Sequence, residues 1–156
     1  MTTETPESSL WRFSLAVYAQ PGVDTACLDL QDRLGADVNL LLFALWAGAV
    51  CGTRLSAAEL ERLSSEAAAW QREVVAPLRG VRRRLKGVAG AEAFRQRIKD
   101  AELESERLEQ TRLCQISGLR PGSADWAAVE ANLRMLITDD TAVALLLDAA
   151  RHHKGD

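Results

Sequence analysis

The chain has 156 residues, of which 47% are hydrophobic and 26% charged, and its formal net charge is −3. This length suits one domain with a sizeable buried core. The ordinary composition excludes a wholly disordered, collagen-like or disulfide-framework chain.

The first residues and the apolar stretches predict a cytoplasmic protein without membrane contact. Residues 1–9 carry Glu4 and Glu7 but no Lys or Arg, whereas a secretory signal begins with basic residues followed by an apolar run. As a helix, the longest apolar stretch, 38–51, would be about 21 Å long, shorter than the roughly 30 Å hydrocarbon core of a bilayer. We expect a flexible segment over 1–8, a single helical domain over 9–152 and a frayed end over 153–156.

The cysteines and histidines do not predict a metal site. The chain has three scattered cysteines, Cys27, Cys51 and Cys114, and no CxxC motif, while His152 and His153 lie near its end. A zinc site needs about four ligands at matched spacing. We therefore expect no metal and no cofactor, and we interpret the cysteines as small apolar residues of a reducing compartment.

The first third of the chain predicts three helices separated by short turns. Pro21 and Gly22 predict the first turn and Gly35 the second, because proline lacks a backbone donor and glycine accepts a positive φ. Asp24 and Asp37 suit N-cap positions, since their side-chain oxygens accept backbone N–H groups. We expect helices that run from a Ser8 or Ser9 cap to Gln20, over 25–34 and, as a central apolar helix, over 38–51.

A capping box predicts the start of a long fourth helix. Ser56 and Glu59 are the two residue types that accept each other's backbone N–H groups across one turn. Over 60–85 the apolar residues recur in steps of three and four, which indicates a narrow apolar seam. Pro77 lies within this seam and removes one backbone donor, so we predict one kinked helix rather than two helices.

The predicted fourth helix is one half of a long helical hairpin. Gly87 and Gly90 bracket a turn, and a fifth helix over 91–117 carries one narrow face made of Phe94, Ile98, Ala101, Ser105 and Leu108. Together these helices predict an antiparallel αα-hairpin over 56–117. Two further helices are expected after caps at Ser123 and at Thr138 or Asp139. No alternating strand pattern occurs, so the predicted fold class is all-α with about seven helices.

The charge is distributed unevenly along this hairpin. Segment 79–99 holds eight basic residues and one acid, a charge of +7, while the rest of the chain has 11 basic and 21 acidic residues, a charge of −10. In-register pairing of the two helices would place the acidic run of the fifth helix far from the turn. We therefore predict that the basic tip of the hairpin is not compensated within the chain.

This basic tip leads to the first functional hypothesis, a non-enzymatic adaptor that binds an anionic partner. The predicted binding residues are Arg79, Arg82, Arg83, Lys86, Arg95 and Arg97, because arginine suits two-point contacts with carboxylate or phosphate. No aromatic residue interleaves with the bases over 79–86, which favours an acidic protein surface over nucleic acid. A solvated helix end, pairing with the acidic body and self-association through the seam are the alternatives.

Asn39 leads to the second functional hypothesis. It lies in the apolar third helix, where a buried amide needs a hydrogen-bond partner, and Gln31, Asp32 or Arg12 could supply one. A small-molecule-binding or enzymatic pocket would be lined by Tyr18, Gln31, Asp32, Asn39 and Trp46. The alternative is a purely structural network. We assign no catalytic residue, since no histidine lies inside the chain to act as a base.

Two stretches of the sequence are similar to one family. Residues 18–46 read YAQPGVDTACLDLQDRLGADVNLLLFALW, and residues 70–86 read WQREVVAPLRGVRRRLK. Both resemble segments of an uncharacterised family of short Gram-negative bacterial proteins that is carried as a domain of unknown function. The resemblance implies a cytoplasmic bacterial protein. Because that family has no assigned catalytic residues, the resemblance implies no chemistry.

Overall fold

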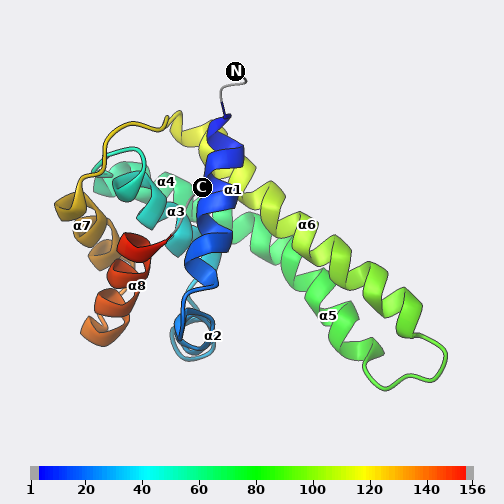
Figure 1. Ribbon diagram of the computed structural model, residues 1–156. Coiled ribbons are helices and arrows are strands. Elements are labelled where there is room, and N and C mark those ends of the chain that lie inside the picture. The colour runs from blue at the N-terminus through cyan, green and yellow to red at the C-terminus, as the bar shows by residue number, and fades with distance from the viewer. Residues whose placement is uncertain (1–3, 154–156) are drawn as a thin grey trace.

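The computed structural model describes residues 4–153, and these residues fold almost entirely into helices (Figure 1). The elements are α1 (Pro6–Tyr18), α2 (Val23–Leu34), α3 (Val38–Ala49), α4 (Ala57–Trp70), the π-helical turn η1 (Gln71–Val75), α5 (Ala76–Leu85), α6 (Glu92–Ser117), α7 (Trp126–Leu136) and α8 (Asp140–His152). No strand occurs over 4–153. Since α4, η1 and α5 follow one another without a break, they form one continuous helix. The all-α prediction with about seven helices is confirmed.

Helix α3 is the centre of the molecule. Eleven of its 12 residues are buried, and it packs against α1, α6, α7 and α8, with further contacts to α2 and α4. Helix α3 approaches α7 closely at Gly48, where an added Cβ would lie 2.6 Å from the backbone nitrogen of Val129. The predicted central apolar helix is therefore present, and it ends at Ala49.

Several helices begin with the caps that the sequence predicted. The Asp37 side chain caps α3, Ser56 and Glu59 form the capping box of α4, and the Asp139 side chain caps α8. In each case a side-chain oxygen accepts a backbone N–H that has no partner within the helix. These three starts depend on local contacts, which explains why sequence patterns located them.

Other helix starts differ from the predictions. Helix α1 begins at Pro6 after a Thr5 cap, so part of the segment predicted to be flexible is helical, while residues 1–3 and 154–156 lie outside the described residues. Helix α2 begins after Gly22, which has a φ of +82°. Helix α7 is capped by Asp125 rather than Ser123. Each prediction had chosen a nearby residue of capping type.

Helices α5 and α6 form a hairpin that projects away from the other helices (Figure 1). We call residues 76–106 the arm and the remaining described residues the body. None of the ten residues of α5 is buried. The two helices are antiparallel, and Arg95 Nε donates a hydrogen bond to the Arg82 carbonyl oxygen across them.

The continuous helix changes its hydrogen-bonding pattern directly before Pro77, where the sequence predicted a kink. Over Gln71–Val75 the bonding is π-helical, and the Ala76 N–H donates to the Gln71 carbonyl five residues earlier. A π-turn rotates the following residues relative to the preceding α-helix. Val75 is buried while Val74, which belongs to the predicted apolar seam, is only half-buried, so the burial pattern departs from the predicted seam at this turn.

The described helices are also too short or too polar to cross a bilayer: none of them meets both requirements for a membrane span.

Candidate functional site

Four of the six buried residues of α6 are polar or charged. Glu102, Ser105, Glu109 and Gln110 are buried, whereas Phe94 and Leu108 are 46% and 45% exposed. Of the five residues predicted to share one face of this helix, only Ser105 is buried. Charged residues are rarely buried unless they are paired, and the partners in this case come from other helices.

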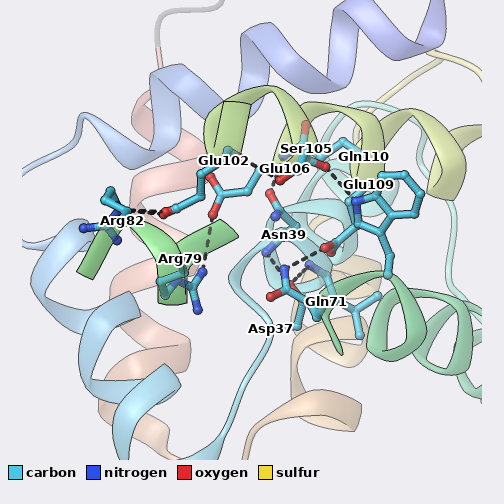
Figure 2. A network of polar contacts seen from close by, with 12 residues as sticks. Asp37, Asn39, Gln71, Arg79, Arg82, Glu102, Ser105, Glu106, Glu109 and Gln110 are labelled. Atoms are coloured by element: carbon cyan, nitrogen blue, oxygen red, sulfur yellow. Dashed lines mark hydrogen bonds and ion pairs between the residues drawn. The ribbon is translucent and has the colours of Figure 1, made fainter. Parts of the chain in front are cut away.

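Two arginines of α5 pair with two acids of α6, Glu102 and Glu106. Arg82 Nε donates to both carboxylate oxygens of Glu102 at 2.9 Å, and Arg79 lies 3.6 Å from Glu106 (Figure 2). The prediction that the basic tip has no compensation within the chain is thus wrong for Arg79 and Arg82. Helical side chains lean toward the N-terminus of their own helix, so side chains on two antiparallel helices lean toward each other and can meet without lying directly opposite.

Of the remaining bases of the arm, only Arg95 forms an ion pair with a described residue. Arg95 lies 3.8 Å from Glu92 in the same helix. Five other bases form no ion pair with any described residue: Arg83, Arg84, Lys86, Arg97 and Lys99. The six predicted binding residues therefore divide into three paired ones and three, Arg83, Lys86 and Arg97, that remain available.

Asp37 and Glu109 form a buried carboxyl pair in the centre of the network (Figure 2). Gln71 Nε2 donates to Glu109 Oε1 at 2.7 Å. Asp37 Oδ2 and Glu109 Oε2 are buried and have no hydrogen-bond donor when both carboxyl groups are charged. Burial, followed by the charge of Asp37, raises the pKa of Glu109 to about 10. Burial also raises the pKa of Asp37, so the pair holds one proton at neutral pH, and this shared proton satisfies both oxygens.

Asn39 has a different partner from those predicted. Gln110 Nε2 of α6 donates to Asn39 Oδ1 at 3.1 Å and to Ser14 Oγ at 3.0 Å. None of the three predicted partners forms this contact. These two hydrogen bonds connect α6 with α1 and with α3 inside the core. Asn39 therefore has a structural role, whether or not it also contacts a ligand.

A cavity of about 440 Å³ lies where α1, α2 and α3 meet the base of the arm. It is lined by four of the five residues of the predicted pocket: Tyr18, Gln31, Asp32 and Asn39. The fifth, Trp46, does not line it, because the indole is fully buried and donates to Ser9 Oγ. Arg79, Arg82 and Arg83 form part of the wall. The two predicted sites, separate in the sequence, thus share one wall.

The nucleophiles and metal ligands of the described residues form no second site. Burial raises the pKa of Cys27 to about 11 and the pKa values of Cys51 and Cys114 to about 12. These thiols are therefore protonated and weakly nucleophilic at neutral pH. Over 4–153 no group of three or more His, Cys, Asp or Glu side chains is placed to hold a metal ion.

Comparison with known proteins adds a family. A family model described as "Protein of unknown function (DUF2390)" matches residues 9–113. The chain belongs to this family. The matched range includes both stretches, 18–46 and 70–86, that resemble an uncharacterised family. No similar protein was found among curated proteins, and none among solved structures.

The DUF2390 match divides the structure into two parts. It begins within α1 and ends within α6, so it contains every residue that lines the 440 Å³ cavity and the whole arm. Helices α7 and α8 lie outside it. The family model therefore covers the segment that forms the cavity and the arm, while the last two helices, which also pack against α3, lie beyond the matched range.

Proposed function

We propose that this protein is a non-enzymatic adaptor whose arm binds an acidic surface of another protein. The observation that carries the proposal is the combination of a projecting helical hairpin with five bases that have no ion-pair partner among the described residues. Because no residue of α5 is buried, this helix contributes little to the packing of the body. Its surface is instead free to meet a partner.

The surface of the arm suits a protein better than a nucleic acid. Val81, Val88 and Phe94 are exposed among the bases, and an interface between proteins combines an apolar centre with a polar rim. The overall pI of about 5.5 is far from that of a typical nucleic-acid-binding domain. A partner with acidic side chains around an apolar patch would complement both features.

The test compares two doubly charge-reversed variants. Arg84→Glu with Arg97→Glu changes the arm without touching the cavity, an ion pair or a lysine amine, and Arg54→Glu with Arg120→Glu makes the same charge change at exposed positions of the body. The tagged proteins are incubated with lysate, treated with nuclease and cross-linked by a carbodiimide, which joins lysine amines directly to carboxylates. We expect a partner cross-linked through Lys86 or Lys99 to the wild type and the body variant, and at least tenfold less of it with the arm variant.

Three outcomes would contradict the proposal. Equal capture by the arm variant would show that the bases are not the contact. Capture that nuclease abolishes would indicate a nucleic acid, and a cross-link to a second copy of this chain would indicate self-association.

The cavity supports a second candidate function, the binding of a small molecule. Its volume of about 440 Å³ is within the range of ligand pockets, and apolar and polar side chains from five helices converge on it. An enzymatic role would need a catalytic group beyond the polar residues that line the wall. We therefore propose binding rather than chemistry for this cavity.

A further inference from the structure

The cavity has an exposed apolar wall. Leu15 of α1, Leu28 of α2 and Leu103 of α6 line it, and each of them is 53% exposed. Trp11 and Leu42 extend the same wall inward. Several large apolar side chains exposed around one hollow are typical of an interaction site, and they would cover the apolar part of a ligand.

The charges of the cavity nearly cancel within the chain. Six charged residues line it, and two pairs account for four of them: Arg82 with Glu102 at 2.9 Å and Arg79 with Glu106 at 3.6 Å. The two that remain are Arg83 on α5 and Asp32 on α2. Neither forms an ion pair with any residue over 4–153.

We propose that the cavity binds a zwitterionic amino acid with a large apolar side chain. This proposal rests on the second candidate function given above. The ligand carboxylate pairs with Arg83, whose planar guanidinium suits two-point contacts with carboxylates. Its ammonium group pairs with Asp32 on the other helix, and its side chain lies against Leu15, Leu28 and Leu103. The two charged groups of the ligand thus pair with Arg83 and Asp32, the two charged cavity residues that form no ion pair over 4–153.

The first part of the test varies the ligand. Wild-type protein is titrated with L-phenylalanine, with phenethylamine, which lacks the carboxylate, and with 3-phenylpropionate, which lacks the amine, and binding is followed by calorimetry. We expect L-phenylalanine to bind at least tenfold more tightly than either analogue. If one analogue binds as tightly as L-phenylalanine, the zwitterion proposal is overturned.

The second part varies the protein. Arg83→Gln and Asp32→Asn remove one charge each, and Arg84→Gln and Asp24→Asn are matched controls on the same two helices that do not line the cavity. We expect each cavity variant to weaken binding of L-phenylalanine at least tenfold and each control to leave it within about twofold. Equal affinity of all four variants would overturn the proposal. Thermal melts show whether each variant is folded.

A neutral apolar probe separates this proposal from the function on which it rests. Indole has an aromatic ring and no charge, and its binding is followed by the amide NMR signals of Leu15 and Leu28. If indole shifts these signals but L-phenylalanine does not, the cavity is a binding pocket and the zwitterion proposal fails. If neither compound shifts them, the small-molecule function fails as well.

Discussion

Helices α3 and α5 have similar lengths, 12 and 10 residues, and opposite environments. Eleven residues of α3 are buried, and none of α5 is. Burial of apolar side chains stabilises α3 through the hydrophobic effect, at roughly 25 cal/mol per Å² of apolar surface removed from water. The difference shows that secondary structure alone does not reveal how a helix is stabilised, or how it responds to mutation, salt and pH.

The arm has polar contacts where the body has an apolar core. Arg82 and Glu102 join its helices, and the Trp70 indole N–H donates to the Ser105 carbonyl at its base, at 2.8 Å. Because Glu102 is buried, the attraction between it and Arg82 is largely offset by the cost of removing both charges from water. The arm is therefore expected to open more readily than the body, as regions with few buried apolar contacts do.

A matched pair of phenylalanine substitutions gives the largest expected contrast. Phe43→Ala removes a fully buried ring of α3 and should lower the free energy of unfolding by about 3–5 kcal/mol. Phe94→Ala removes an exposed ring of the arm and should change it by less than about 1 kcal/mol. Urea denaturation measures both. Similar losses for the two variants would contradict the division into an apolar body and a polar arm.

A pair of glycine substitutions should have effects of opposite sign. Gly48→Ala places a methyl group against the α7 backbone and should cost about 1–3 kcal/mol. Gly80→Ala lies in α5 with no atom within 4 Å of the new Cβ, and it should stabilise by about 0.5–1 kcal/mol because alanine favours helix. Melting temperatures should therefore move in opposite directions. A rise for Gly48→Ala would show that α3 and α7 are not closely packed.

The carboxyl pair beneath the arm predicts a pH dependence. Because burial raises the pKa of Glu109 from 4.5 to about 10, the folded chain holds more protons than the unfolded chain between these values. This group's contribution to stability is therefore lost as the pH rises through that window. Glu109→Gln keeps the shape and has no proton to lose. It should be more stable than the wild type at alkaline pH, by on the order of 1 kcal/mol.

The control for this prediction is Glu104→Gln, which removes an exposed carboxylate of the same helix. The free energy of unfolding is measured by urea denaturation between about pH 5 and pH 9. It should depend on pH as in the wild type for this control, and should depend on pH less steeply for Glu109→Gln. Equal slopes for the two variants would show that Glu109 is ionised in the folded chain.

Salt should give the smallest effect and should act mainly on the arm. At about 1 M salt the Debye length falls to about 3 Å, which weakens exposed ion pairs. Amide hydrogen exchange over 79–100 should accelerate by a few-fold, while exchange of α3 should not accelerate. Arg82→Met should reproduce the acceleration at low salt, because it removes the pairing with Glu102. Uniform acceleration in both regions would contradict a separate response of the arm.

Sequence patterns located the elements well and the contacts between them less well. The capping box at Ser56, the cap at Asp37 and the glycine-bounded turn of the hairpin are local, so the residue types alone predicted them. The buried face of α6 was missed because apolar periodicity assumes that acids point to solvent. The facing arginines at 79 and 82 and the acidic run at 102–109 were the available signal, but their pairing depends on side-chain lean across antiparallel helices.

The two candidate sites show the same limit. The residue types in the sequence led us to predict a pocket lined by Tyr18, Gln31, Asp32 and Asn39, and all four line the cavity. They did not predict that Arg83 lies on the same wall, since more than 40 residues separate it from Asn39. Trp46 was wrongly included because an apolar helix position does not distinguish a cavity wall from the closed core.

By itself the sequence determined the all-α class, the buried central helix, the long hairpin and the separation of +7 from −10 along the chain. These properties follow from residue types at short spacing. The tertiary structure decided which charges are compensated, which two carboxyl groups are buried together and where a cavity remains. Those outcomes depend on distances between helices that are far apart in the chain, and electrostatic and packing energies vary steeply with such distances.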